Sequence, residues 1–425
     1  MSGCSYLKWR REKTEQRHEL TQRPGDLLLQ KDYAPEDCFG LIGKLSLLPG
    51  QEVPLLVAAF DHSSLGHELV GAREVTAADG YYGILLPPGT YDLVAFADLN
   101  GDGFFETSEA VGRTSPEAPV FVTASRSPDG AVIPGPQVAI DLTKPMATET
   151  AVRIKVNPRP YVVPSVEDPL FSPELGELGV YHPNQFLART QRWVFAVGEP
   201  DFQKVQIVLV HGINGTPRDF HALIAGLDRA RYQVWLFYYP SGLALDKVGI
   251  VLAKVVETIA SESHVSSKLR LVVVAHSMGG LVGRRGVNEL CRNGKPPYLK
   301  LYASFDTPYG GVESAAEAVK REVELVPSWK DVAAGSDFVT RIHEVPLPKE
   351  LPFHLFFGWG KGGTHGPSTA GDGTITLASQ LDPRAQAAAT GMTGFADTHV
   401  GVLEDPAAIR ALAELLDATA GPNAR

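Results

Sequence analysis

The chain has 425 residues, a length that predicts two domains with connecting segments. Hydrophobic residues make up 44% and charged residues 21%, which is typical of a globular protein, and a net charge of −10 without a block of Lys or Arg argues against nucleic-acid binding. No run of 18 apolar residues is present, so the sequence contains no membrane-spanning helix.

Residues 1–34 are polar and charged and lack periodicity, which predicts a tether. Residues 35–145 have the pattern of a small all-β domain, because short apolar runs alternate with turns rich in Gly, Pro and Asp. The turn Pro87-Pro88-Gly89 joins two of these runs. The segment resembles transthyretin-like and carboxypeptidase-regulatory-like β-sandwiches. The expected strands are 39–48, 54–60, 81–86, 91–97, 119–123 and 137–142.

An acidic loop in this domain has the spacing of a calcium site. Oxygen ligands at alternate positions with a Gly at the bend can converge on one cation. A strand precedes the loop, so a pair of EF-hand helices is not expected, and a solvated acidic turn is the alternative. The candidate ligands are Asp98, Asn100, Asp102, Glu106 and Glu109.

Residues 146–190 are rich in Pro and are predicted to be a linker. From residue 191 onwards strands and helices alternate, which predicts a mostly parallel sheet flanked by helices. Thr216 and Pro217 have the types preferred at a helix start. The expected strands are 207–210, 232–239, 269–275, 298–305 and 353–357, and the expected helices are 247–260, 278–290 and 406–418.

The sequence Ala275-His276-Ser277-Met278-Gly279-Gly280 lies between an expected strand and an expected helix. A serine nucleophile that stands clear of a sheet needs a sharp turn, and this turn demands small residues two positions before and after it. Ala275 stands where the first Gly is usual. The pattern predicts Ser277 as the nucleophile, at a helix N-terminus that favours negative charge on the substrate oxygen.

A second loop, His211-Gly212-Ile213-Asn214-Gly215, follows the strand 207–210. Acyl transfer needs two N–H donors for the developing oxyanion, one from the residue after the nucleophile and one from a loop after an earlier strand. Met278 is the first donor. We expect His211 to brace the loop and His276 to be a packing residue.

The acid and the base of such a site follow the serine in the order acid, then His. Asp372 lies one loop after the strand 353–357, and His399 is the histidine that follows it. The expected roles are His399 as base and Asp372 as the acid that fixes its tautomer. Asp306, at the end of the preceding strand, is the rival acid, and a tight turn is the structural alternative for Asp372.

Residues from about 190 to 420 resemble the lipase and esterase branch of the α/β-hydrolases, including bacterial lipases with the Ala-His-Ser-Met-Gly motif and inositol-deacylase-like proteins. The resemblance implies an α/β-hydrolase domain preceded by the all-β domain. It also implies hydrolysis of carboxylic esters, including lipid esters, through an acyl-enzyme and without a catalytic cofactor. By the same resemblance, Ile213 supplies the second oxyanion N–H. An acyltransferase or amidase, and an inactive binding protein, are the alternatives.

Residues 311–351 exceed the length of a simple crossover and predict a cap over the site, with a crossover helix as the alternative. Cys38 and Cys291 could form a disulfide or be buried thiols.

Ser2-Gly3-Cys4 resembles the end of a bacterial lipoprotein signal, although the apolar stretch that precedes such a site is not in this sequence. Either the true start lies upstream or the signal has been removed. We therefore expect Cys4 to carry a lipid that holds the protein at the membrane surface of a bacterial cell envelope. The alternative is a cytoplasmic protein in which the motif occurs by chance.

Overall fold

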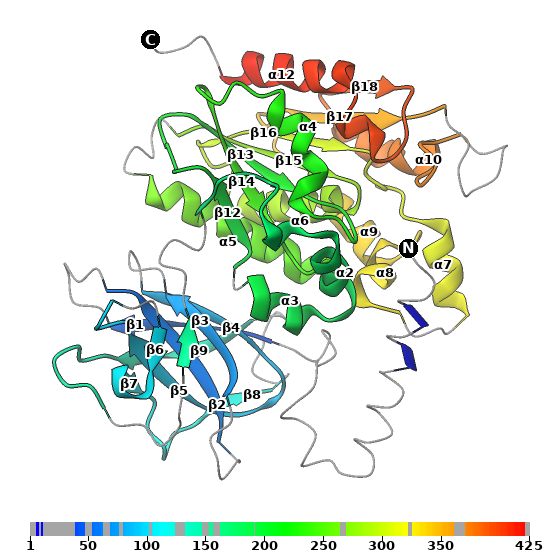
Figure 1. The fold of residues 1–425 in the computed structure, drawn as a ribbon. Coiled ribbons are helices and arrows are strands. Elements are labelled where there is room, and N and C mark those ends of the chain that lie inside the picture. The colour runs from blue at the N-terminus through cyan, green and yellow to red at the C-terminus, as the bar shows by residue number, and fades with distance from the viewer. Residues whose placement is uncertain are drawn as a thin grey trace. The chain divides into compact units, whose positions relative to one another are not determined.

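The computed structural model describes residues 6–7, 10–11, 39–46, 53–62, 69–75, 80–101, 104–123, 132–146, 153–155, 162–190, 192–263, 269–321, 325–360 and 370–420. The chain divides into two compact units, Ser2–Pro160 and Tyr161–Arg425. The first unit is built mainly of strands, and the second combines strands with helices (Figure 1). No helix in these ranges is long and apolar enough to span a bilayer.

Two main sheets form the first unit, one with the strand order β4-β1-β9 and the other with the order β3-β2-β5-β7, to which β8 is added beside β5. Alternate residues of β1 are buried, and Leu41 and Leu45 share one core with Val57 and Leu93 of the other sheet. The unit is therefore β-rich, as predicted. Its strands are β1 (Phe39–Ser46), β2 (Leu55–Asp61), β3 (Leu69–Val75), β4 (Tyr81–Leu86), β5 (Gly89–Ala97), β6 (Phe104–Glu106), β7 (Ala110–Arg113), β8 (Val120–Val122), β9 (Val132–Ala139) and β10 (Arg153–Lys155), with the short helix η2 (Thr107–Glu109).

The second unit contains one eight-stranded sheet with the order β11-β12-β14-β13-β15-β16-β17-β18. All neighbouring pairs are parallel except β12 and β14. Every residue of β13 and β15 is buried, which explains their continuous apolar sequences. The strands are β11 (Val162–Val163), β12 (Val194–Val197), β13 (Val205–Val210), β14 (Tyr232–Phe237), β15 (Leu271–His276), β16 (Leu299–Phe305), β17 (Phe353–Gly358) and β18 (Gly391–Phe395).

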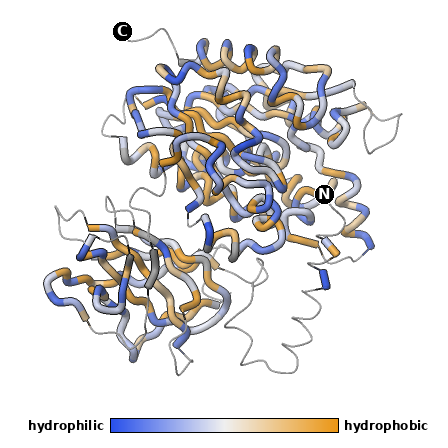
Figure 2. The backbone as a smooth tube through the Cα atoms, in the orientation of Figure 1, coloured by the Kyte–Doolittle hydropathy of each residue, from blue (hydrophilic) through white to orange (hydrophobic). Residues whose placement is uncertain are grey.

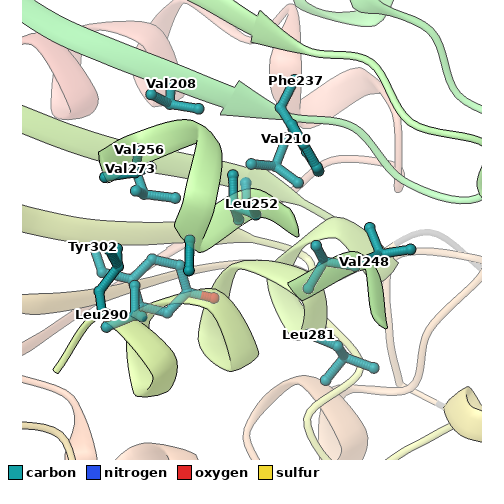
Figure 3. Packing of buried hydrophobic residues seen from close by; sticks show 14 of the residues in the cluster. Val208, Val210, Phe237, Val248, Leu252, Val256, Val273, Leu281, Leu290 and Tyr302 are labelled. Carbon is teal, nitrogen blue, oxygen red and sulfur yellow. The ribbon is translucent and has the colours of Figure 1, made fainter. Parts of the chain in front are cut away.

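Helices α5 and α6 pack against each other and against the sheet. Val248 and Leu252 of α5 and Leu281 of α6 lie in one cluster with Val210 and Tyr302 of the strands (Figure 3). Hydrophobic segments concentrate in the strands at the centre of this unit (Figure 2). The helices are η4 (Pro169–Phe171), α2 (Pro173–Tyr181), α3 (Pro183–Thr190), η5 (Pro217–Phe220), α4 (His221–Ala225), α5 (Leu245–Glu262), α6 (Met278–Leu290), α7 (Glu313–Lys320), α8 (Pro327–Val332), α9 (Asp337–Glu344), α10 (Leu377–Gln380), α11 (Pro383–Ala388), η6 (Gly401–Leu403) and α12 (Pro406–Ala420).

The segment expected to be a linker differs from that expectation over residues 162–190. These residues form β11, η4, α2 and α3. Three of the four prolines in this range stand where a helix tolerates them: Pro169, Pro173 and Pro183 are each the first residue of a helix. A high Pro content therefore reflects a series of helix starts here.

The segment 311–351 was expected to be a cap, and the structure places much of it in the core. Val332 of α8 and Phe338 and Ile342 of α9 belong to the cluster under the sheet. The buried Arg284 of α6 donates hydrogen bonds to the carbonyl oxygens of Ile342 and Val345 at the end of α9. Helices α8 and α9 thus follow the crossover alternative, because their apolar faces pack on α5, α6 and the sheet.

Candidate functional site

Ser277 stands alone between a strand and a helix: β15 ends at His276 and α6 begins at Met278. Its φ of 55° lies in the left-handed region, which is strained for a residue other than Gly. The turn is possible because its neighbours are small. A Cβ on Gly279 would overlap the carbonyl oxygen of His211, and a Cβ on Gly280 would overlap the Thr307 side chain.

Three predicted side chains form one hydrogen-bonded row. The Oγ of Ser277 lies 2.8 Å from Nε2 of His399, and Nδ1 of His399 lies 2.7 Å from Oδ2 of Asp372. Because a carboxylate only accepts, Nδ1 carries the ring proton and Nε2 accepts the Ser277 hydroxyl proton. His399 follows β18 and Asp372 lies in the loop between β17 and α10, so three separate loops at one edge of the sheet supply the row.

Asp372 is held as a carboxylate by several donors. Its Oδ1 accepts the backbone N–H groups of Thr374 and Ile375 at 2.8 and 2.7 Å, and its Oδ2 accepts Nε2 of Gln380 at 3.0 Å in addition to His399. Burial alone would raise the pKa of Asp372, but the hydrogen bond and charge of His399 together with these amides hold it below its usual value. The flanking turn is thus compatible with the predicted acid role, because the turn itself supplies the backbone donors.

The rival acid, Asp306, also lies close to His399. It follows β16, is fully buried, and has an Oδ2 that lies 4.0 Å from Nδ1 of His399. His276 is near it and does more than pack, because its Nε2 donates to the carbonyl oxygen of His399 at 2.7 Å. Burial, followed by the neighbouring His399, lowers the pKa of His276 to about 3, so its ring is neutral.

His276, Asp306 and His399 place one N or O atom each within 4.8 Å of one another, the spacing of a metal site. The Nε2 of His276 is bonded to a carbonyl oxygen and the Nδ1 of His399 is bonded to Asp372. These two ring nitrogens thus already serve as hydrogen-bonding groups in the site. The cluster therefore fits acid–base chemistry better than a cation.

Two backbone N–H groups next to Ser277 have no acceptor within the described ranges, those of Ile213 and Met278. A Cβ built on Gly212 would lie 2.8 Å from Cβ of Ser277 and 3.2 Å from its Oγ, so the loop backbone passes directly beside the hydroxyl. Asn214, with a φ of 54°, donates its N–H to Oγ of Ser241 at 3.0 Å and keeps the turn in place. The loop can therefore present an N–H group to a substrate oxygen.

His211 braces this loop. Its Nδ1 donates to the carbonyl oxygen of Gly212 at 2.8 Å, its Nε2 accepts the N–H of Tyr239 at 3.3 Å, and Oη of Tyr239 donates back to the His211 carbonyl oxygen at 2.8 Å. Burial lowers the pKa of His211 to about 4. A neutral ring with both nitrogens occupied has a structural role.

The acidic loop of the first unit is closed by its own backbone. Oε1 of Glu109 accepts the N–H groups of Leu99 and Asn100, and its Oε2 accepts the N–H of Glu106. Oδ1 of Asp98 accepts the N–H of Gly101 at 2.8 Å. Among the candidate calcium ligands, Glu109 is thus already occupied by backbone donors, and Asp102 lies outside the described residues.

Cys4 and Cys38 also lie outside the described residues, and the half-buried Cys291 is a free thiol. Gln380 was not predicted as a site residue, because nothing in the neighbouring sequence distinguishes a Gln whose side chain donates a hydrogen bond to the carboxylate of Asp372. A Gln eight positions after an Asp is too common in sequences to indicate that the two side chains are in contact.

Solved structures of lipases and esterases are similar to a part of this chain. The mature lipase BlEst2 of Bacillus licheniformis has 17% identity over 53% of this chain and 98% of its own, with a TM-score of 0.44. The esterase PF2001 of Pyrococcus furiosus has 16% identity over 52% of this chain and 83% of its own, with a TM-score of 0.38. Phospholipase PlaB of Legionella pneumophila has 16% identity over 42% and 44%, with a TM-score of 0.35.

No curated protein matches the chain. One family does match a part of it. The matching segment contains the loop at Ile213, the turn at Ser277 and the acid Asp306, and it ends before Asp372 and His399. Residues 203–342 match the family described as "Putative serine esterase (DUF676)".

Proposed function

We propose that this protein is a carboxylic ester hydrolase that forms an acyl-enzyme on Ser277. The observation that carries the proposal is the hydrogen-bonded row from Ser277 through His399 to Asp372, with distances of 2.8 and 2.7 Å. A nucleophile bonded to a base that is in turn oriented by an acid is the arrangement that acyl transfer needs. The serine-esterase family matched by residues 203–342 supports the same class.

In the proposed reaction, Oγ of Ser277 attacks the ester carbonyl carbon while Nε2 of His399 takes the hydroxyl proton. His399 then gives this proton to the leaving alcohol oxygen, and the C–O bond of the ester breaks. Water, deprotonated by the same nitrogen, attacks the acyl-enzyme and releases the acid, and the proton returns to Ser277. Asp372 keeps the Nδ1–H tautomer throughout and stabilises the imidazolium.

The oxyanion formed in each step would be bound by the N–H groups of Ile213 and Met278. Both are unbonded within the described ranges, and Met278 is the first residue of α6, where the helix dipole favours negative charge. Removing one such donor typically costs about 100- to 1,000-fold in kcat. All of these steps use protein groups and water, so the proposal includes no catalytic cofactor.

For the substrate we propose an ester with an apolar acyl group, including lipid esters. Two side chains adjacent to the site along the chain are apolar: Ile213 is half-buried and Val400, directly after His399, is 52% exposed. Such surfaces favour an apolar group over a charged one. An acyltransferase or amidase using the same residues is the second candidate, because the acyl-enzyme is common to all three.

Hydrolysis of p-nitrophenyl esters from acetate to palmitate by the full chain tests the proposal. We expect burst kinetics, a preference for medium or long chains, and loss of nearly all activity in Ser277→Ala with an unchanged circular dichroism spectrum. A fluorophosphonate should label Ser277. Labelling at another serine, or no hydrolysis and no labelling, would contradict the proposal, and product analysis with added alcohols or amines would identify transfer.

A further inference from the structure

A second buried carboxyl group lies beside His399. Asp306 follows β16 and Asp372 comes after the neighbouring parallel strand β17, so the sheet brings both acids to the same edge. Asp306 and Asp372 are 0% and 1% exposed. Oxygen atoms of the two acids lie 4.0 and 2.7 Å from the same nitrogen, Nδ1 of His399.

The two acids have unequal hydrogen bonding. Asp372 accepts four hydrogen bonds, from His399, Gln380 and the amides of Thr374 and Ile375. No hydrogen bond of ordinary geometry reaches either carboxyl oxygen of Asp306 within the described residues, and its polar neighbours are the carboxyl group of Asp372 and the backbone of Gly358. Two adjacent buried carboxyl groups cannot both be charged at low cost, and the one with the donors keeps the charge. Burial, followed by the charge of Asp372, raises the pKa of Asp306 well above its usual value.

The backbone around Asp306 holds the pair together. A Cβ built on Gly358 would lie 3.0 Å from Oδ2 of Asp306 and 3.0 Å from Cβ of Asp372, so both acids pack against a glycine. Asp306 itself has a φ of 48°, a conformation that Asn tolerates as well as Asp. The substitution Asp306→Asn therefore removes the acid with little change in shape.

We propose that Asp306 is a second positioning acid of the Ser277 site, protonated while Asp372 carries the charge and able to orient His399 when Asp372 is neutral. The inference rests on the proposed hydrolase function. When Asp372 is neutral, the Asp306 carboxyl group loses its proton to solvent and its carboxylate accepts Nδ1–H of His399. A side-chain rotation closes the 4.0 Å gap, and no other bond is made or broken.

Kinetics of the full chain test this with the variants Asp372→Asn, Asp306→Asn and the double variant. In a Ser-His-Asp site without a second acid, neutralising the acid costs about 10,000-fold in kcat. We expect Asp372→Asn to lose less than about 100-fold in kcat, the double variant to lose about 10,000-fold, and Asp306→Asn alone to lose far less than the double variant. Asp372→Ala, with and without Asp306→Asn, repeats the comparison if the Asn variant is poorly folded.

A pH profile distinguishes the orientation of His399 by Asp306 from a purely structural effect of the Asp306 substitution. The groups that face Asp306 are Asp372, Asp397, His276 and His399. In Asp372→Asn, activity should increase with pH as Asp306 loses its proton, and this rise should disappear in the double variant. The matched control is Asp331→Asn, which changes a half-buried acid in α8 bonded to the N–H of Leu245, outside the cluster. When Asp331→Asn is combined with Asp372→Asn, kcat should decrease only by the small factor that Asp331→Asn causes alone.

Equal activities of Asp372→Asn and the double variant would overturn the inference. Fluorophosphonate titration of the folded, labelled fraction normalises every rate. If the wild type neither hydrolyses esters nor is labelled at Ser277, the proposed function itself fails. If the wild type is active but the double variant is no less active than Asp372→Asn, only the role of Asp306 is rejected.

Discussion

Gly212 lies beside the hydroxyl of Ser277, where an added side chain would collide with Ser277. A Cβ at this position would come within 2.8 Å of Cβ of Ser277, and the neighbouring N–H of Ile213 is the proposed oxyanion donor. A misplacement of about 1 Å in such a site can cost about 100-fold in rate. The position therefore links the backbone path of the loop to the proposed chemistry.

We expect Gly212→Ala to lower kcat for a p-nitrophenyl ester by about 100-fold while the circular dichroism spectrum is unchanged. The control is Gly83→Ala in the first unit, where the nearest atom to an added Cβ is 3.9 Å away. Activity of Gly212→Ala equal to that of the control would show that the loop does not approach the reacting atoms.

At the scale of elements, Glu109 connects η2 to the loop after β5. It is 4% exposed and accepts three backbone N–H groups, from Leu99, Asn100 and Glu106. Hydrogen bonds to a charged acceptor contribute about 1.5 to 3 kcal/mol, and donors left unpaired in a buried place add to the loss. The carboxylate thus serves the loop whether or not an ion is bound.

Glu109→Ala should therefore destabilise the first unit by about 2 kcal/mol and lower its Tm by roughly 8 °C in calorimetry. Exposed Glu117→Ala is the control. Calcium binding by this loop stays a prediction of the ligand spacing: millimolar calcium should raise the Tm of the wild type and not of Glu109→Ala. An unchanged Tm in both would leave the loop as a turn closed by its own backbone.

At the scale of the whole molecule, every residue of the proposed site belongs to the unit Tyr161–Arg425. Ser277, His399 and Asp372 are positioned by strands of one sheet. We expect a protein of residues 161–425 to fold and to keep kcat within a few-fold of the full chain, with Ser277→Ala in the same protein as control. A well-folded but inactive product would mean that the first unit contributes to the reaction.

The Ser2-Gly3-Cys4 motif concerns the location of the whole molecule. A lipid on Cys4 would place the protein in the membrane fraction, and Cys4→Ala would release it, because a lipid anchor contributes its apolar chains to the bilayer. Expression from the native locus, fractionation and mass spectrometry of the N-terminal peptide measure this. A protein with unmodified Cys4 in the cytoplasm would end the lipoprotein hypothesis.

Much of the architecture was predictable because local patterns agree with the fold. The continuous apolar residues of β13 and β15 indicate strands buried on both faces, and the helix predicted over 278–290 is the observed α6. Several strands were not predicted, namely β3, β6, β7, β10, β11, β12 and β18. Of these, β3 is a charged edge strand, and β6, β10 and β11 have only two or three residues. The helices within 162–190 were missed because Pro was taken as a linker signal instead of a first helical residue.

The sequence by itself selected Ser277 and His399 as the candidate nucleophile and base, since a strand, a sharp turn and a helix select the serine and chain order leaves one histidine after Asp372. It left Asp306 and Asp372 as alternatives, because each follows a strand. Only the tertiary structure decided how they differ. The turn after Asp372, Gln380 and the distant His399 together give four hydrogen bonds to Asp372, whereas no bond of ordinary geometry reaches Asp306 among the described residues. Of two neighbouring carboxyl groups, the one with more hydrogen-bond donors keeps the negative charge, and folding determines which donors surround each group.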